Sequence, residues 1–139
     1  MTNPLYLPLH LDGVIVMEMV EHALRDHPIE ACGMVVGPRI GKPLSYWPMR
    51  NILASPTAFA FDPDEYLRAC SQMDRLGWDP LAIFHSHTVE PAEPSEYDEA
   101  VSFETDRAYV IVSTVDEEPV MRAWRRVGDG LTEVSIEVG

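Results

Sequence analysis

A short apolar strand, a proline-rich loop and the start of a helix follow one another in residues 81–98, which read LAIFHSHTVEPAEPSEYD. Successive strand side chains point to opposite faces of a sheet, so His85 and His87 share one face, about 7 Å apart at their α-carbons. That separation lets two imidazoles converge on one metal ion. Asp98 follows a loop whose prolines restrict the backbone, and it can supply a third ligand. Two histidines and one carboxylate leave the fourth tetrahedral position open for water, so the pattern predicts a catalytic type of metal centre.

The same residues also fit a purely structural role. Ser95-Glu96-Tyr97-Asp98 matches a helix-capping box, with Ser95 as the N-cap and Asp98 at the third helical position. The two roles are compatible, because the first turn of a helix holds its side chains in defined directions. The ordered combination of His85, His87 and Asp98 is what favours the metal site over the cap alone.

A second apolar strand is expected over residues 31–37, directly after Glu30. A glutamate at the start of a strand is usually solvated, and by itself Glu30 carries no functional signal. Cys32 is expected to be buried and to act as a small hydrophobe. A minor alternative is that its thiolate is an additional metal ligand in a resting state.

Together these residues resemble the motif of a known family. His85-x-His87, seven further residues, Ser95, two more residues and Asp98, with Glu30 upstream in Glu-Ala-Cys-Gly, resemble the motif of the JAMM or MPN-plus (Mov34/MPN/PAD-1) metalloproteases. The resemblance implies that His85, His87 and Asp98 are zinc ligands, that Glu30 is the general acid/base and that Ser95 stabilises the oxyanion. It also implies one zinc ion with a bound water as the cofactor, although such ligands accept iron, cobalt or nickel too.

The resemblance covers the chain from about Leu11 to Val127 and implies a fold. The expected class is α/β (α+β): a single MPN/JAMM domain over residues 1–139, with a mixed central β-sheet flanked by about three helices in a cytidine-deaminase-like architecture. One departure is Thr88, where many members have proline after the second histidine. This departure concerns the conformation of the loop and not the ligands.

Within the family, the chain looks most like the compact bacterial Mec-type branch, which releases cysteine from a sulfur-carrier protein. The implied function is a zinc-dependent amidase or isopeptidase acting at the C-terminal Gly-Gly tail of a small ubiquitin-like or sulfur-carrier protein. Arg50-Asn51 and Ser55-Pro56-Thr57 also match this branch, without a role that the residues themselves reveal. The alternatives are removal of ubiquitin-like tags from lysine, processing of a carrier tail in a biosynthetic pathway, and a non-catalytic MPN scaffold.

The amino-acid composition limits the binding partners and the cellular compartment that we expect for this protein. A chain of 139 residues with 46% hydrophobic and 24% charged residues is typical of one globular domain. Its net charge of −13 opposes binding to nucleic acids and anionic membranes. Residues 1–8 lack the features of a secretory signal, and two cysteines suit a reducing compartment. We therefore expect a cytoplasmic protein with no nucleic-acid or membrane partner, for which a homodimer is possible.

Five glutamates lie near the proposed site in sequence. We expect them to form a solvated face, and the alternative is a docking rim for a basic partner; they are Glu90, Glu93, Glu96, Glu99 and Glu104.

Periodicity and turn signals predict three helices and seven strands. The helices are expected over residues 13–26 after Asp12, over 63–77 after Asp62, and from near Ser95 onward. The predicted core-facing residues are Val14, Met17, Val20 and Leu24 in the first, Tyr66, Leu67, Cys70 and Met73 in the second, and Val101 and Phe103 in the third. Strands are expected over 31–37, 44–49, 59–61, 81–85, 109–114, 120–126 and 131–138, the last as an edge strand or a dimer contact.

Three further groups of residues are expected to be structural. They are the packing anchors Trp47, Trp78 and Trp124, the surface or helix-end residues His10, His22 and His27, and the edge-strand residues Arg122, Arg125 and Arg126.

Overall fold

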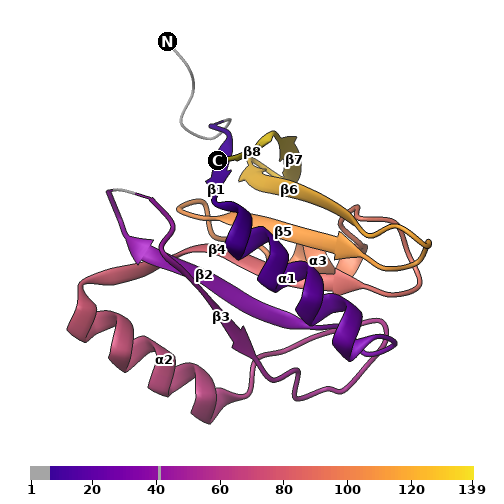
Figure 1. Ribbon diagram of the computed structural model, residues 1–139, viewed down its shortest axis with the longest axis horizontal. Coiled ribbons are helices and arrows are strands. Elements are labelled where there is room, and N and C mark those ends of the chain that lie inside the picture. Colours follow the sequence, from indigo (N-terminus) through magenta and orange to yellow (C-terminus); the bar gives the residue numbers. More distant parts are fainter. Residues whose placement is uncertain (1–6, 41) are drawn as a thin grey trace.

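The computed structural model describes residues 7–40 and 42–139 and contains a six-stranded sheet in the order β3-β2-β4-β5-β6-β7 (Figure 1). The β4 and β5 strands are parallel and all other neighbours are antiparallel. The strands are β2 Cys32–Pro38, β3 Ser45–Met49, β4 Trp78–His87, β5 Ala108–Ser113, β6 Val120–Val127 and β7 Gly130–Val134. The predicted mixed sheet is confirmed.

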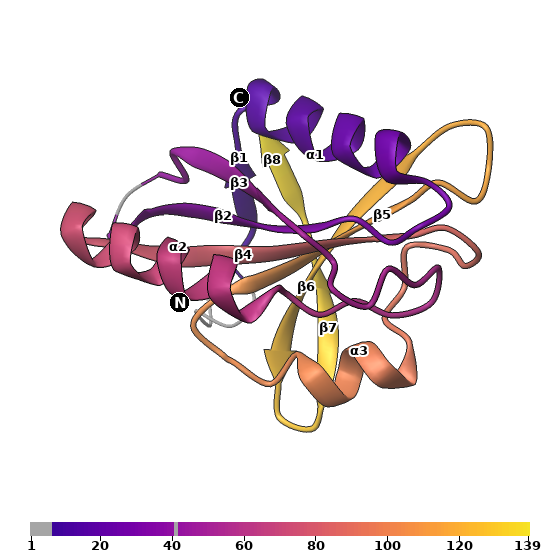
Figure 2. The same ribbon diagram turned by 90° about the horizontal axis from the view of Figure 1, so that it is seen from below.

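Helices cover both faces of this sheet (Figure 2). The α1 helix (Gly13–Asp26) lies on one face, and α2 (Pro63–Leu76) and α3 (Glu96–Val101) lie on the other. Alternation along the strands divides the core, so that Val35 and Phe84 pack with α1, whereas Met34 and Ile83 pack with α2. Because β2 and β4 are covered on both faces, β2 and residues 81–84 of β4 form continuous apolar runs.

No helix within the described ranges is both long and apolar enough to cross a membrane. The expectation about a secretory signal falls mainly on residues 1–6, which lie outside the described part of the chain.

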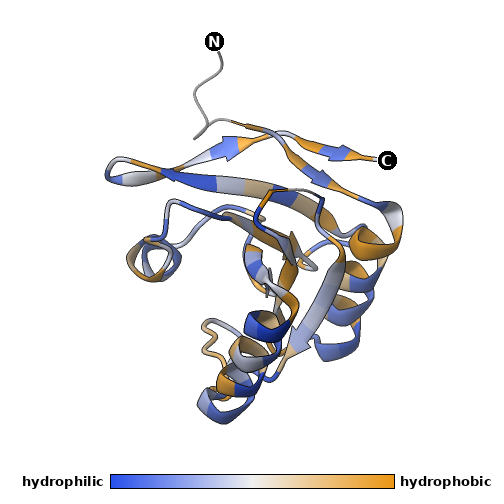
Figure 3. Cartoon of the chain, turned by 90° about the vertical axis from the view of Figure 1, so that its left-hand side faces the viewer, coloured by the Kyte–Doolittle hydropathy of each residue, from blue (hydrophilic) through white to orange (hydrophobic). Residues whose placement is uncertain are grey.

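The α1 helix has its predicted limits but not its predicted buried face. Asp12 Oδ1 accepts a hydrogen bond from Ile15 N at 2.8 Å and caps the helix. Val14, Met17 and Leu24 are 64%, 58% and 51% exposed, so their prediction as core residues was wrong. The buried residues are Ile15, Met19, His22 and Ala23, and Val20 is half-buried. Apolar and polar residues alternate around the turns of α1 (Figure 3), so the helical period fits more than one face.

His22 is a buried link between α1 and β3, and its prediction as a surface or helix-end residue was wrong. Its Nδ1 lies 2.6 Å from Tyr46 Oη and its Nε2 lies 3.0 Å from Asp26 Oδ2. Burial lowers the pKa of His22, although Asp26 opposes this effect. His10 and His27 are exposed, as expected.

The α2 and α3 helices begin at their predicted caps and bury fewer residues than predicted. Asp62 caps α2, and Gly77 ends it with a φ of 70° in the left-handed region. Leu67 is 65% exposed, and Val101 and Phe103 are 40% and 66% exposed, so these three predictions were wrong. The physical reason in α3 is its length of six residues, which leaves little room for a buried stripe.

Two predicted strands differ from the structure. Residues 59–61 form no strand and contribute a single bridge, Asn51 to Phe61. The predicted strand 131–138 divides into β7 and β8 (Ile136–Val138), and β8 pairs in parallel with β1 (Leu9–Leu11), a strand that was not predicted. The trailing strand therefore has pairing partners inside the chain, β6 for its first part and β1 for its second.

The arginines of β6 do not protect an edge, because β6 lies between β5 and β7. Arg122 pairs with Glu93 and Glu133, and Arg125 Nε donates to Leu7 O at 2.9 Å. Arg126 is buried and its Nε donates to Ser102 O at 2.9 Å. Their prediction as edge residues was wrong, because β6 pairs with β5 on one side and with β7, which includes part of the predicted strand 131–138, on the other.

The three tryptophans are packing residues, as expected. The rings of Trp47 and Trp78 have centroids 6.2 Å apart and pack with the core on the α2 side. Trp124 is 9% exposed and packs with Tyr109 and Ile111.

We predict that Gly33→Ala destabilises the protein by about 1–3 kcal/mol, measured by urea unfolding. A β-carbon at Gly33 would lie 2.7 Å from Trp47 O and would also clash with Tyr46 Oη, and the backbone atom cannot move without disturbing the pairing of β2 with β3. Gly13→Ala is the matched control, because a β-carbon there meets nothing within 4 Å and alanine favours the helix start. Equal stabilities for wild type and Gly33→Ala would contradict the prediction.

Candidate metal centre

Two histidines at the end of β4 and one aspartate in the first turn of α3 meet in a buried cluster. His85, His87 and Asp98 are 3%, 1% and 2% exposed. His85 Nε2 lies 3.1 Å from Asp98 Oδ1, and His87 Nε2 lies 2.9 Å from Asp98 Oδ2. The two Nε2 atoms are 3.1 Å apart. The fold thus brings together the three side chains that the sequence singled out as ligands.

The dimensions of the cluster fit a small divalent cation. Around a tetrahedral ion with bonds of about 2.0–2.1 Å, neighbouring ligand atoms are about 3.3 Å apart. The nitrogen and oxygen atoms of His85, His87 and Asp98 are separated by 2.9 to 3.1 Å, close to that edge length. A small outward adjustment of the side chains would therefore accommodate an ion. Among the described residues, these three are the group whose donor atoms can hold one.

Outer contacts orient both imidazoles. His87 Nδ1 lies 2.7 Å from Pro91 O, and since a carbonyl oxygen only accepts, Nδ1 carries the proton and Nε2 can present its lone pair to the cluster. The His85 ring stacks on Phe59, with centroids 4.5 Å apart and planes inclined by 19°. Burial lowers the pKa of His85, although Asp98 opposes this effect, and so favours the neutral form that binds metals.

Asp98 combines the capping role with its place in the cluster. Asp98 N donates to Ser95 Oγ at 3.1 Å, and Ser95 N donates to Asp98 Oδ2 at 2.9 Å, so the predicted capping box is confirmed. Burial by itself raises the pKa of Asp98, but the adjoining imidazoles of His85 and His87 and the hydrogen bond from Ser95 N outweigh it and hold the pKa well below its usual range. The carboxylate is therefore ionised and supplies a negative charge to the cluster.

Glu30 lies beside the cluster because of the register between β2 and β4. Cys32 pairs with His85, and continuing this antiparallel register places Glu30 opposite His87. Glu30 is 2% exposed, and its Oε1 has no hydrogen-bond partner among the described residues. Burial raises the pKa of Glu30 to about 8, although His87 opposes the shift. A buried carboxyl oxygen without a partner is costly and indicates a group that binds something the chain itself does not supply.

The remaining residues of the motif have clear positions. Ser95 is half-buried, and its Oγ accepts from Asp98 N, which leaves its hydroxyl proton available. Cys32 packs with apolar residues between β2 and α2, and its Sγ lies 3.7 Å from Met49 O. Burial raises the pKa of Cys32 to about 12, so it is a thiol and acts as a packing residue. Thr88 Oγ1 donates to Pro28 O at 2.9 Å and so anchors the start of the loop that follows the second histidine.

Two of the five glutamates near the site form ion pairs with arginines of β6. Glu93 pairs with Arg122 and Glu99 pairs with Arg126, while Glu96 and Glu104 are exposed. This arrangement fits the expected solvated face better than a continuous docking rim.

Sequence reasoning missed three residues that shape the site, namely Asn51, Phe59 and Pro91. For Asn51, the available signal was the match of Arg50-Asn51 to the family branch, to which no role could be assigned. For Pro91, the signal was the proline content of the loop. Nothing local in the sequence indicated the stacking of Phe59 on His85.

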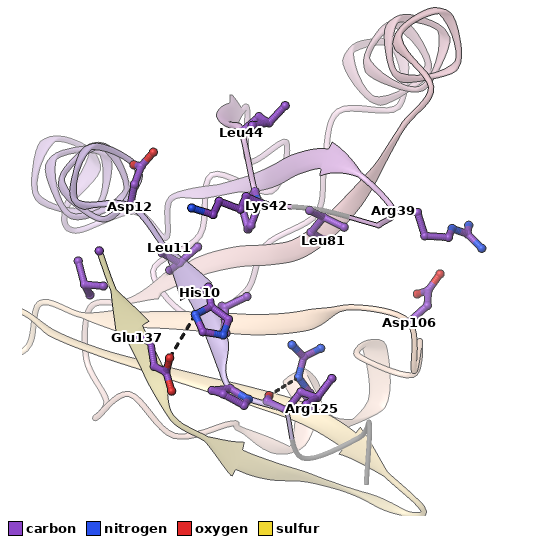
Figure 4. Close-up of a pocket in the computed structure, with 16 residues that line it drawn as sticks. His10, Leu11, Asp12, Arg39, Lys42, Leu44, Leu81, Asp106, Arg125 and Glu137 are labelled. Carbon is purple, nitrogen blue, oxygen red and sulfur yellow. Dashed lines mark hydrogen bonds and ion pairs between the residues drawn. The ribbon is translucent and has the colours of Figure 1, made fainter. Parts of the chain in front are cut away.

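Two hollows flank different parts of the fold. One is an apolar pocket of about 360 Å³ lined by Phe59, whose ring stacks on His85; its other residues include Phe61, Tyr66, Tyr97 and Phe103. A larger cleft of about 830 Å³ lies between β1 and the turn after β2, lined among others by His10, Lys42 and Arg125 (Figure 4). No residue of the cluster lines this larger cleft.

Comparison with known proteins defines the class. Residues 14–127 match the family of prokaryotic homologs of the JAB domain, and the chain belongs to this family. It is 40% identical over 126 residues to the CysO-cysteine peptidase of Mycobacterium tuberculosis, covering 89% of this chain and 86% of that protein. It is 37% identical over 93 residues to a probable TtuB-protein conjugate cleaving protease of Thermus thermophilus, covering 66% and 62% of the two chains.

Solved structures agree with this assignment. Protein DSY2949 from Desulfitobacterium hafniense superposes with a TM-score of 0.83 at 34% identity, covering 94% of this chain and 92% of that one. A JAB1/MPN domain protein from Archaeoglobus fulgidus superposes with a TM-score of 0.60 at 20% identity, covering 95% and 97% of the two chains, and so has the same fold. The chain is thus a hydrolytic enzyme of the JAB family, as the motif implied.

We predict that Glu30→Gln stabilises the metal-free protein, with a gain that increases from about pH 4.5 to pH 8. The pKa of Glu30 is raised from 4.5 to about 8, so the folded state binds a proton that the unfolded state has lost in this window. The contribution of Glu30 to stability is therefore complete below pH 4.5 and is lost as the pH rises through 8.

Thermal unfolding of both proteins without metal, at pH 5, 7 and 9, measures this gain. Glu137→Gln is a control at an exposed carboxylate. A difference in Tm between wild type and Glu30→Gln that does not change with pH would contradict the prediction.

Proposed function

We propose that the chain is a zinc-dependent amidase that hydrolyses a peptide-type bond at the C-terminal Gly-Gly tail of a small ubiquitin-like or sulfur-carrier protein, releasing cysteine. The observation that carries this proposal is the convergence of His85, His87 and Asp98 beside the unpartnered carboxyl of Glu30. This is a donor set with an open tetrahedral position, next to a group able to transfer a proton.

The chemistry of the donors supports zinc. Two neutral imidazoles and one carboxylate are ligands that zinc accepts in catalytic sites, and their spacing suits tetrahedral geometry. When bound, zinc lowers the pKa of a coordinated water to about 7 and polarises the carbonyl of the substrate. His85, His87 and Asp98 would hold the ion, with Pro91 and Ser95 N as the outer hydrogen-bond partners.

Glu30 serves as the general acid/base in this proposal. Its carboxylate accepts a proton from the attacking water and then donates that proton to the leaving nitrogen. Burial raises its pKa to about 8, and a cation in the cluster would bring that pKa down toward neutrality. Proton transfer in both directions is most effective when the pKa is close to the working pH.

Ser95 stabilises the oxyanion in this proposal. Its Oγ is fixed by the bond from Asp98 N at the start of α3, and its hydroxyl proton is free to be donated to the developing negative oxygen. Such a donor typically contributes about 2.7–4 kcal/mol to the stability of the transition state.

The substrate is inferred from the relatives and from physical considerations. Similarity over most of both chains to a CysO-cysteine peptidase supports a carrier protein with cysteine as the leaving group. Glycines without side chains can pass through a narrow groove and pair with an exposed strand edge, which suits a Gly-Gly tail. Both cysteines of the chain are free, which fits a reducing cytoplasm.

A second candidate is an isopeptidase that removes a ubiquitin-like carrier from lysine side chains. The similarity to a probable TtuB-protein conjugate cleaving protease favours this candidate. The two functions share the same catalytic residues and differ in the leaving amine, so substrate turnover distinguishes them.

We predict that Asp98→Asn lowers zinc affinity by at least about 100-fold, as measured by competition with a chromophoric chelator. The substitution removes the negative charge that faces His85 and His87 but keeps an oxygen able to accept from Ser95 N. The start of α3 is therefore retained, and the loss is attributable to the carboxylate. Zinc content equal to that of the wild type would reduce Asp98 to a helix cap.

We predict that the zinc-loaded protein cleaves a carrier ending in Gly-Gly-Cys at least about 10-fold faster, in kcat/KM, than the same carrier joined through Gly-Gly to a lysine side chain. Mass spectrometry of the released carrier measures both rates. Preference for the lysine conjugate would support the isopeptidase instead, and cleavage of neither conjugate would contradict both functions. Glu30→Gln is the matched inactive variant, expected to bind zinc normally and to lose at least about 100-fold in kcat.

A further inference from the structure

The side-chain amide of Asn51 uses all of its hydrogen-bonding capacity to close one loop. Asn51 Nδ2 donates to Glu30 O and to Ala58 O, each at 3.0 Å. Asn51 Oδ1 accepts from Leu53 N at 3.1 Å and from Ala60 N at 3.2 Å. A primary amide offers two donors and two acceptor sites, so all four are filled. We call residues Asn51–Phe61 the 51–61 loop.

This loop, and not a neighbouring strand, holds the main chain of Glu30. Glu30 N donates to Ser55 O at 2.9 Å, and Glu30 O accepts from Asn51 Nδ2. The pairing of β2 with β3 stops at Cys32, two residues later. The 51–61 loop therefore replaces the sheet at the position of the Glu30 carboxyl.

The carboxyl group itself lacks an equivalent anchor. Glu30 Oε1 is buried and has no hydrogen-bond partner among residues 7–40 and 42–139. The place of this oxygen thus follows from packing and from the position of the Glu30 main chain, which the 51–61 loop fixes.

The same loop also touches a member of the metal-binding cluster. Phe59 stacks on His85, and Tyr97 Oη of α3 donates to Phe59 O at 2.8 Å. Asn51 binds the peptide groups on both sides of Phe59, at Ala58 O and Ala60 N. The side-chain amide of Asn51 therefore links the main chain of Glu30 to the segment that carries the Phe59 ring, and so sets their relative position.

We propose that Asn51 is a positioning residue of the active site, which sets the distance between the Glu30 carboxyl and the cluster of His85, His87 and Asp98. Asn51 does not touch the substrate and acts through Glu30 and Phe59. The proposal rests on the proposed function, in which Glu30 transfers the proton. A displacement of about 1 Å at such a group is enough to lower a rate by about 100-fold.

The test is the isosteric substitution Asn51→Asp in the full-length, zinc-loaded protein. It keeps the two bonds accepted by Oδ1 and removes the donations to Glu30 O and Ala58 O. We expect kcat toward the Gly-Gly-Cys carrier to fall by about 10- to 100-fold, with KM within about 3-fold and zinc content unchanged. A merely structural residue would lower the folded fraction but leave kcat per zinc-loaded molecule unchanged. Such an unchanged kcat overturns the proposal.

Thr57→Val is the matched control, because Thr57 lies in the same loop and its hydroxyl contacts Ser55 Oγ and not Glu30. It should retain the wild-type kcat. Should Asn51→Asp fail to fold, Asn51→Gln keeps the amide but displaces it by one methylene, and the same loss of kcat is expected.

Amide hydrogen exchange separates this proposal from the proposed function. In Asn51→Asp, or in Asn51→Gln if Asn51→Asp does not fold, the Glu30 N–H should exchange at least about 10-fold faster than in the wild type, whereas Thr57→Val should not change it. If the wild type cleaves no carrier conjugate, the proposed function fails, while faster exchange at Glu30 still supports the anchoring role of Asn51. Wild-type exchange at Glu30 in the Asn51 variant overturns that role.

Discussion

The antiparallel pairing of β2 with β4 is the constraint on which the rest of the site depends. Its register joins Cys32 to His85, and this places Glu30 opposite His87 with both side chains on one face. A slip of one residue would turn the two histidines toward α1, into the core that Val35 and Phe84 occupy. The slip would also move the apolar side chains of β4 from the α1 face to the face that carries the polar cluster, and this cost prevents it. Packing of the sheet therefore fixes the chemistry at its end.

The third member of the cluster comes from a helix too short to be stable by itself. The α3 helix has six residues, and isolated helices of this length do not persist in water. Its N-terminus is closed by the capping box of Ser95 and Asp98. Its C-terminal carbonyls, at Glu99 and Ser102, accept from the buried guanidinium of Arg126. Arg126 thus has a structural task that explains why it points inward from β6, and the position of Asp98 depends on both ends of α3 being held.

Local signals predicted much of this molecule, and long-range contacts account for what was missed. The caps Asp12, Asp62 and Ser95 marked the three helix starts, because a cap acts over three residues. The spacing of His85, His87 and Asp98 predicted that they would meet, since one strand and one helix start carry all three. In contrast, the pairing of β1 with β8 joins opposite ends of the chain. The buried face of α1 depends on the strands it packs against. Because α1 carries apolar residues on several sides, its own sequence does not show which side is buried. The partners of Asn51 lie from residue 30 to residue 60, a pattern that no window of sequence reveals.

The two carboxyl groups of the site have opposite environments, and this difference separates their roles. Asp98 lies against two imidazoles and receives a hydrogen bond from one backbone N–H, and these contacts overcome burial and keep it ionised. Glu30 is equally buried but receives no such bonds at Oε1, so burial dominates and raises its pKa to about 8. When their environments shift the pKa values of two acids in opposite directions, one acid commonly serves as a fixed charge and the other as a proton carrier. A cluster built only for stability would have paired both acids, because an unpartnered buried carboxyl is destabilising. The unpaired state of Glu30 therefore supports the proposed role as proton carrier, and the surrounding loop and sheet maintain it at the expense of folding stability.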